Sequence, residues 1–328
     1  MVIKMNARRN FIKTVGRGIA ISAITPSVIA GSFSADKNIR IGIIGAENSH
    51  SYGYGKLFNI EKKFPGVEVK YIWGETDEFA KRSMKLGNIP NQVKDQREML
   101  GKIDALIVDH RHAKYHLKAA LPFVKAGIPT FVDKPFCYRA DEGKEFLELA
   151  KKLGTPISSY SSIAHSNGTL DLKKQISELH NVKQIVRTGT IDLDSKYGGF
   201  FFYGVHLVQP LLDMVDDVVE RVKVTRIGSH GSANIVFKSG LFATLVFKEV
   251  AYGWETFVES KEGFAQLNPA VEEPNPGVNY VDMVEMFKTG KEPRSHQRIL
   301  DSVSVLEAME KSAKTEKWIE LCYLKLSY

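Results

Sequence analysis

The stretch IRIGIIGAENSHSYG, residues 39–53, has the pattern of a buried strand that turns sharply into a helix. Five of its first six residues are isoleucine or glycine, and the run ends at Gly45, where the chain must turn tightly. In the common form of this turn two more glycines follow, and here those positions carry Glu47 and His50. The stretch therefore predicts the first strand and turn of a doubly wound sheet, with unusual side chains in the turn.

Outward from this stretch, short apolar runs alternate with helical patterns through the first half of the chain. The segments LKAALPFVKAG and EFLELAKKLG are predicted helices, and each closes on a glycine that can end a helix. Strands that alternate with helices form crossover units and a parallel sheet. The predicted strands are residues 40–44, 67–73, 105–109, 130–132 and 157–160.

The pattern changes after about residue 160. The segments QIVRTGTIDL, RVKVTRIG, ANIVFKSG and LFATLVF are strand-like and are not separated by helices, which predicts a mostly antiparallel sheet. We expect a helix over 169–179 to cover one face of this sheet. Apolar residues at three- and four-residue spacing predict a helix over 297–313 that packs back on the first domain.

The predicted fold class is therefore α/β, with an N-terminal Rossmann domain and an α+β domain built on a mostly antiparallel sheet. We place the Rossmann domain at 36–158 and the second domain at 159–328. Residues 1–35 precede both domains and are predicted to be an export signal.

The charge distribution supports this export signal. The net charge is +7, but residues 1–35 contain five cations and no acid, and the remaining residues balance at 40 basic and 38 acidic. That balance gives no reason to expect nucleic acid as a partner. The sequence RRNFIK at 8–13 resembles a twin-arginine signal, and small residues offer cleavage sites after Ala30 or Ala35. The apolar run 18–29 is shorter than the roughly 20 residues of a membrane span, so we expect a periplasmic protein without a stable membrane anchor.

Three segments carry a resemblance to a known family. The first is HRHAKYHLKAALPFVKAGIPTFVDKPF at 110–136, in which a histidine opens a helix and Asp-Lys-Pro follows a buried strand. The second, GGFFFYGVHLVQ at 198–209, contains Gly204 and His206. The third is the tail at 280–312. Together they resemble the glucose–fructose oxidoreductase and inositol dehydrogenase (Gfo/Idh/MocA) family over most of the chain from Ile39 onward.

This resemblance implies an oxidoreductase that transfers a hydride between NAD or NADP and a sugar or polyol derivative. It assigns Lys134 to polarise the substrate hydroxyl and His206 to exchange the proton, and such chemistry needs a cation and a group of near-neutral pKa. We expect Tyr160 and Tyr203 to contact the substrate together with these two residues. The resemblance also implies a homo-oligomer.

The same resemblance implies a set of cofactor-binding residues at the carboxyl edge of the first sheet, where ligands bind in such folds. These residues are Gly45, Ala46, Asn48, Ser49, His50, Glu75, His112, His116, Asp133 and Lys134.

The chain departs from the family pattern at four places around this cleft. Glu47 and His50 replace glycines, and a carboxylate about 4 Å from a phosphate charge costs roughly 1 kcal/mol in water and about 4 kcal/mol at an effective dielectric of 20. Glu47 must therefore turn away from a bound pyrophosphate. The acidic position of the second strand falls on Gly74, with Glu75 as a substitute. Phe202 stands where the family often has an aspartate, and residues 111–113 replace a Thr-Pro-Asn turn.

These departures leave a second hypothesis open, a non-redox member of the fold that binds sugar as a pseudoenzyme or acts as a metal-assisted lyase. Five histidines are predicted near the same edge: His50, His110, His112, His116 and His206. We predict no metal site, because no carboxylate or cysteine completes a recognisable ligand spacing. The two cysteines, Cys137 and Cys322, are expected to be unpaired and half-buried.

Overall fold

The computed structural model describes residues 38–249, 253–269 and 277–327 of the 328-residue chain. The predicted export signal, residues 1–35, lies outside the described residues, so export stays a prediction. In the described part of the chain, every helix is too short or too polar to cross a membrane.

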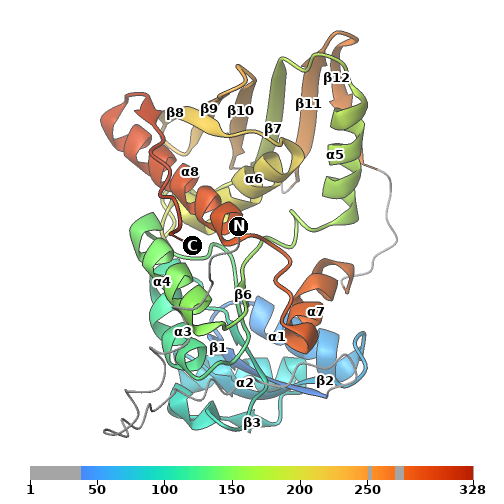
Figure 1. The fold of residues 1–328 in the computed structure, drawn as a ribbon, viewed down its shortest axis with the longest axis vertical. Helices are drawn as coiled ribbons and strands as arrows, with labels where there is room; N and C mark the ends of the chain where they lie inside the picture. The colour runs from blue at the N-terminus through green and yellow to red at the C-terminus, as the bar shows by residue number, and fades with distance from the viewer. Residues whose placement is uncertain (1–37, 250–252, 270–276, 328) are drawn as a thin grey trace, which may run out of the picture. The chain divides into compact units, whose positions relative to one another are not determined.

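The first sheet is the doubly wound parallel sheet that the sequence predicts (Figure 1). Its order is β3-β2-β1-β4-β5-β6, so the chain begins in the middle and winds outward in both directions. The central strands β1 and β4 are almost entirely buried and apolar, as expected for a sheet covered on both faces. The strands are β1 (Ile39–Ile44), β2 (Val67–Trp73), β3 (Asn91–Gln92), β4 (Ala105–Val108), β5 (Thr130–Val132) and β6 (Ile157–Ser158).

Four α-helices connect these strands. They are α1 (His50–Gly55), α2 (Asp77–Gly87), α3 (His116–Lys125) and α4 (Ala140–Leu153). A π-helical segment, Lys56–Ile60, extends α1, and 3-10 turns occupy Gln96–Met99 and Ala113–Tyr115. Helix α4 ends at Gly154, which adopts the left-handed conformation that favours glycine.

The second sheet has the order β12-β11-β7-β10-β9-β8-β13 and is antiparallel except for the β7–β10 pair. The mostly antiparallel second sheet is thus confirmed, although the sequence missed its two strands at one edge, β11 and β12. The strands are β7 (Gln184–Thr190), β8 (Val219–Ile227), β9 (His230–Phe237), β10 (Phe242–Lys248), β11 (Glu255–Ser260), β12 (Gly263–Leu267) and β13 (Ile319–Glu320).

One helix of the second half, α6 (Phe200–Met214), is buried along nearly its whole length and packs against β7 and α8. Helix α8 (His296–Thr315) contacts β8 on one side and α4 on the other, so it connects the two sheets (Figure 1). The remaining helices are α5 (Asn167–Glu178), α7 (Val281–Thr289) and a 3-10 turn at Val278–Tyr280. The predicted helices 169–179 and 297–313 correspond to α5 and α8.

The two cysteines are both free, as predicted, but they are not half-buried. Cys137 is buried at the end of the β5–α4 connection, where burial raises the pKa of its thiol, whereas Cys322 is exposed.

The turn after β1 depends on glycine at Gly45. Its φ is +110°, and a Cβ added there would lie 2.6 Å from the backbone carbonyl carbon of Asp109. We expect Gly45→Ala to lower the free energy of unfolding by about 3 kcal/mol or more, because both the backbone conformation and the contact are unfavourable.

The matched control is Gly53→Ala within α1, where an added Cβ meets nothing within 4 Å. This change should be neutral or stabilise by about 0.5–1 kcal/mol, since alanine is the better helix former. Urea unfolding followed by circular dichroism measures both, and equal effects would contradict the assigned turn geometry.

Candidate active site

The candidate site lies at the carboxyl edge of the first sheet, where β1, β4 and β5 end side by side. Asp109 follows β4, and Asp133 and Lys134 follow β5. These three residues are all buried, although ionisable side chains are rarely buried without partners. The chain has therefore concentrated charge at one edge of an otherwise apolar sheet.

Lys134 and His206 converge on this edge from the two halves of the chain. The Lys134 ammonium nitrogen lies 5.2 Å from the ring centre of Phe202 and 5.5 Å from that of Tyr203, both in the first turn of α6. The His206 ring lies one turn further along α6, with its centre 5.6 Å from that of Tyr203. Lys134, Tyr203 and His206 thus form one continuous group.

His206 is held in the neutral form. Burial is the main cause that lowers the pKa of His206 well below its ordinary value, and the positive charge of Lys134 lowers it further. The Nδ1 atom of His206 lies 2.7 Å from the hydroxyl oxygen of Ser161. Ser161 is held in turn by Gln209. The backbone N–H of Ser161 donates a hydrogen bond of 2.6 Å to the side-chain oxygen of Gln209. A neutral imidazole in this setting can accept a proton at pH 7.

Lys134 is also desolvated. Burial lowers the pKa of Lys134 from its usual value, while Asp133 and Asp109 act in the opposite direction. Phe202 packs against the ammonium where the resemblance leads one to expect an aspartate, so α6 supplies no carboxylate to this cation. The peptide bond between Lys134 and Pro135 is cis.

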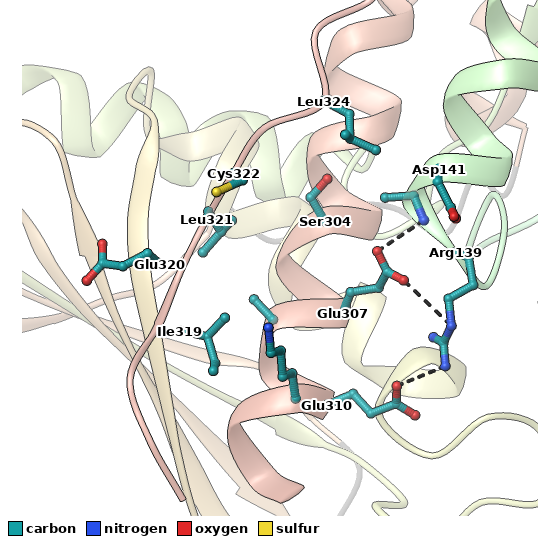
Figure 2. Close-up of a pocket in the computed structure, with 13 residues that line it drawn as sticks. Arg139, Asp141, Ser304, Glu307, Glu310, Ile319, Glu320, Leu321, Cys322 and Leu324 are labelled. Atoms are coloured by element: carbon teal, nitrogen blue, oxygen red, sulfur yellow. Dashed lines mark hydrogen bonds and ion pairs between the residues drawn. The ribbon is translucent and has the colours of Figure 1, made fainter. Parts of the chain in front are cut away.

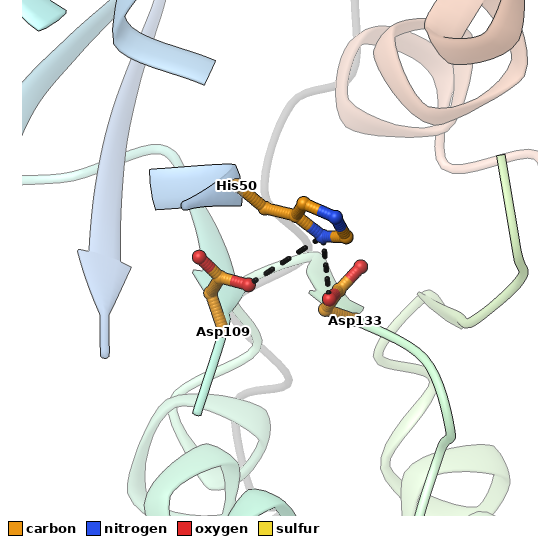
Figure 3. A group of neighbouring side chains, drawn as sticks. All are labelled: His50, Asp109 and Asp133. Atoms are coloured by element: carbon orange, nitrogen blue, oxygen red, sulfur yellow. Dashed lines mark hydrogen bonds and ion pairs between the residues drawn. The ribbon is translucent and has the colours of Figure 1, made fainter. Parts of the chain in front are cut away.

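A second group, beside Lys134, joins His50 to two buried carboxylates (Figure 3). The His50 Nδ1 atom lies 2.9 Å from an oxygen of Asp133 and 4.0 Å from one of Asp109. The side-chain amide of Asn48 donates to both carboxylates, at 2.7 Å to Asp109 and 3.3 Å to Asp133. Asn48 and His50, from the phosphate turn, therefore fix the ends of β4 and β5.

The two carboxylates differ in protonation. Burial and the adjacent Asp133 raise the pKa of Asp109 well above its usual value. Burial acts on Asp133 in the same direction, but His50 and Lys134 outweigh it and hold the pKa of Asp133 below its usual range. Two carboxylates this close do not both ionise readily, so Asp133 carries the charge and Asp109 the proton.

His50, Asp109 and Asp133 also offer three ligand atoms that lie within 4.8 Å of one another. The sequence spacing from which we predicted no metal site could not reveal this group, because these residues meet only in the fold. However, the oxygens that face His50 already accept hydrogen bonds from Asn48. The arrangement favours a hydrogen-bonded cluster over a metal centre, and the prediction of no metal stays a prediction.

The phosphate turn is bound by an acidic residue of the neighbouring strand. One carboxylate oxygen of Glu75 accepts from the backbone N–H groups of Ala46 and Glu47, at 2.8 and 2.9 Å. The other oxygen, Oε1, is buried and has no partner. Glu75 therefore lies against the turn, and its second carboxylate oxygen has no hydrogen-bond donor.

Glu47 turns away from the interior of the turn, as its charge requires. Its carboxylate accepts a hydrogen bond of 2.5 Å from the hydroxyl of Tyr197, in the connection between β7 and α6. The same hydroxyl accepts from Arg111 at 3.2 Å. These three residues bridge the phosphate turn, the end of β4 and the second half of the chain.

A crevice of about 350 Å³ opens at the ends of β2 and β4 on the same edge. Trp73, at the end of β2, lines it together with His110 and Tyr115. The His110 Nδ1 atom is buried without a partner, and burial lowers the pKa of His110 to about 3, so the ring is neutral. Such rings offer a surface on which a planar aromatic group can stack.

Two predicted cofactor-binding histidines have other contacts. His116 is completely buried, and its ring nitrogens face the backbone carbonyls of His110 at 2.8 Å and Pro135 at 3.0 Å. It thereby connects the end of β4 to the loop that carries Lys134, and the structure does not place it on the cleft surface. His112 packs edge-on against Tyr138, with ring centres 5.0 Å apart.

Two further predicted residues lie apart from this group. Tyr160 is 1% exposed and packs between Phe131 and His165, so it does not reach the cleft. Ser49 is exposed immediately before α1, and its side chain does not cap the helix. Sequence reasoning also missed Asp109 and Tyr197 as members of the site, because no motif contains them.

A separate crevice of about 430 Å³ lies between α8, the start of α4 and β13 (Figure 2). Arg139 forms ion pairs there with Glu307 and Glu310, and a glutamate oxygen accepts from the backbone N–H of Ala140. Among the described residues that line it, none is a predicted site residue.

Part of the chain matches a known protein family. Residues 39–161 match the Gfo/Idh/MocA family, described as "Oxidoreductase family, NAD-binding Rossmann fold". The matched segment contains the phosphate turn, Glu75, Asp133 and Lys134, and the family binds NAD. A comparison of the sequence with curated proteins finds no match.

Solved structures show the same fold over nearly the whole chain. GenD2 from gentamicin A biosynthesis, in complex with NAD, is 15% identical with a TM-score of 0.75, covering 87% of this chain and 97% of that one. Myo-inositol dehydrogenase from Lactobacillus casei, in complex with NAD(H) and myo-inositol, is 14% identical with a TM-score of 0.74, covering 88% and 98%. Myo-inositol 2-dehydrogenase from Lactobacillus plantarum is 15% identical with a TM-score of 0.73, covering 87% and 100%. Both domains of the Gfo/Idh/MocA fold are therefore present.

Proposed function

We propose that the protein is an NAD-dependent oxidoreductase that oxidises a hydroxyl group of a sugar or polyol derivative. The observation that carries this proposal is the convergence of a buried lysine and a neutral buried histidine, from two different domains, at the carboxyl edge of an NAD-binding sheet. The likeness to inositol dehydrogenases supports the substrate class.

In this proposal each residue has one task. The ammonium of Lys134 donates a hydrogen bond to the substrate hydroxyl and stabilises the oxygen as negative charge develops on it. Neutral His206 accepts the hydroxyl proton, and Ser161 at its Nδ1 atom holds the ring in place. NAD, when bound, accepts the hydride that leaves the same carbon. Phe202 and Tyr203 exclude water from the ammonium.

Several features of this chain fit the adenosine half of NAD. The unpartnered Oε1 atom of Glu75 is an acceptor for a ribose hydroxyl, and the crevice lined by Trp73, His110 and Tyr115 suits the adenine ring. The outward orientation of Glu47 removes its charge from the interior of the turn. The second hypothesis, a non-redox protein without dinucleotide, has no comparable support from these contacts.

Two parts of the proposal concern the whole protein. We propose export by the twin-arginine route, supported by the residues at 8–13, and a homo-oligomer formed through the outer face of the second sheet. On that face, Phe257 and the 61% exposed Phe264 stack on each other. Export is tested by changing Arg8 and Arg9 to lysine, after which cell fractionation should find the protein in the cytoplasm. The homo-oligomer is tested by light scattering, which should give a mass above that of one chain.

Removing either catalytic side chain should abolish turnover without unfolding the protein. We expect Lys134→Met and His206→Asn each to lower kcat/KM by about 10²–10⁴-fold while NAD affinity changes little. Because the pKa of His206 is lowered, the acidic limb of the kcat/KM profile should lie below pH 6.5. The control is His165→Asn, which changes a half-buried histidine stacked on Tyr160. A Lys134→Met variant with wild-type turnover would remove Lys134 from the mechanism.

The carboxylate of Glu75 should make the enzyme prefer NAD to NADP, because it would repel a 2′-phosphate. We expect the Kd for NADP to be at least about tenfold higher than the Kd for NAD. In Glu75→Gln the ratio of these two Kd values should fall by about tenfold. Glu78→Gln removes an exposed carboxylate in the first turn of α2 and should leave the ratio unchanged. Isothermal titration calorimetry with both dinucleotides tests this, and an unaltered ratio in Glu75→Gln would contradict the assigned role.

A further inference from the structure

Arg111 occupies a position in the cleft that the proposed mechanism does not use. It follows β4 by three residues, and its guanidinium carbon lies 5.1 Å from the ring centre of Phe202. The ammonium nitrogen of Lys134 lies 5.2 Å from the same ring centre. Two cations therefore lie against one aromatic ring, at the place where an aspartate would be expected from the resemblance.

The guanidinium of Arg111 has hydrogen-bond partners for only some of its N–H groups. Its Nη1 atom donates to the Tyr197 hydroxyl at 3.2 Å, and its plane packs 4.3 Å from the ring centre of Tyr197. Its Nε atom is buried and has no hydrogen-bond partner. The Nε and Nη2 hydrogens form the side-on fork with which arginine binds a planar carboxylate through two parallel hydrogen bonds. Tyr197 holds the opposite end, so the guanidinium is oriented while its Nε hydrogen has no acceptor.

The surrounding charge favours an anion. Among the described residues Arg111 has no direct ion pair, and the nearest acid along its contacts, Glu47, is reached only through the Tyr197 hydroxyl. The charge of Arg111 contributes to lowering the pKa of Lys134, after burial, so the two cations affect each other. A third cation, Arg187 on β7, is 2% exposed; its Nη1 atom donates to the hydroxyl of Thr256 at 2.9 Å, and no ion pair joins it to an acid among the described residues. Buried cations without acids are costly, and an anionic ligand would offset that cost.

We propose that Arg111 binds a carboxylate of the substrate and thereby places a neighbouring hydroxyl beside Lys134 and His206. The substrate class is then an acidic sugar or polyol, such as a uronate or an aldonate, and Arg111 is a specificity-determining residue. This inference rests on the proposed function for the identity of the reacting hydroxyl, but the carboxylate site itself requires no turnover. Phe202 contributes by removing the carboxylate that would repel such a substrate.

Binding measurements with matched ligands test this directly. With saturating NAD present, D-glucuronate, D-galacturonate and D-gluconate are titrated into the wild-type protein, alongside D-glucose as the neutral analogue and D-glucose 6-phosphate as the alternative anion. We expect at least one of the three acids to bind about tenfold or more tightly than D-glucose. Tighter binding of the phosphate than of every acid would overturn the choice of a carboxylate.

Substitutions of Arg111 show whether this residue causes the preference for acids. Arg111→Met should weaken binding of the preferred acid by about ten- to a hundredfold, leave D-glucose unchanged, and raise KM more than it lowers kcat, since a charge-assisted bidentate contact is lost. Arg111→Lys should recover only part of the affinity, because lysine lacks the planar fork. The control is Arg139→Met, which removes an arginine packed on Tyr138 at 4.1 Å, beside the crevice of Figure 2.

Three outcomes would overturn the inference: no acid binds better than D-glucose, Arg111→Met binds acids as the wild type does, or Arg111→Met loses affinity for NAD instead. The last result would assign Arg111 to the cofactor phosphates. Failure of the proposed function is distinguishable, because Arg111-dependent binding of an acid without NADH formation would retain this site and reject the redox reaction. Oxidation of neutral polyols with no preference for acids would retain the redox reaction and reject the carboxylate site at Arg111.

Discussion

The burial of charge at the ends of β4 and β5 is the constraint on which the rest of the site depends. An ionised Asp133 next to a charged Lys134, both shielded from water, persists only if each is held by partners that cannot move apart. His50 and Asn48 provide those partners for the carboxylates, while Asp109 stays protonated. His50, in the phosphate turn, thus has a structural role, because it stabilises the carboxylate of Asp133, the residue that precedes Lys134.

The second requirement is that a helix of one domain reaches the sheet edge of the other. Helix α6 is apolar on almost every side, so it can be buried between β7 and α8, and only then does His206 face Lys134. The neutral state of His206 follows from that burial. Packing of the second domain therefore sets the protonation state of His206 beside Lys134 of the first domain. Neither domain alone would contain both groups in this arrangement.

The sequence was sufficient for the fold, and its motifs singled out the two residues for which we propose catalytic roles. Alternation of strands and helices predicted the first sheet, and the Asp-Lys-Pro and Gly-x-His motifs identified Lys134 and His206. It failed where contacts join distant segments. Asp109 and Tyr197 belong to no motif and reach the site through strand order and a long connection. His116 was misjudged because its place in the motif says nothing about where its ring nitrogens point, and they face backbone carbonyls. Tyr160 was misjudged because a residue just after a strand can turn into the core.

The bridge from Glu47 through Tyr197 to Arg111 has a kinetic consequence. It joins the phosphate turn and the end of β4 to the connection before α6, so these parts of the chain cannot separate without breaking both hydrogen bonds. Any opening motion between them is therefore slower than it would be without Tyr197.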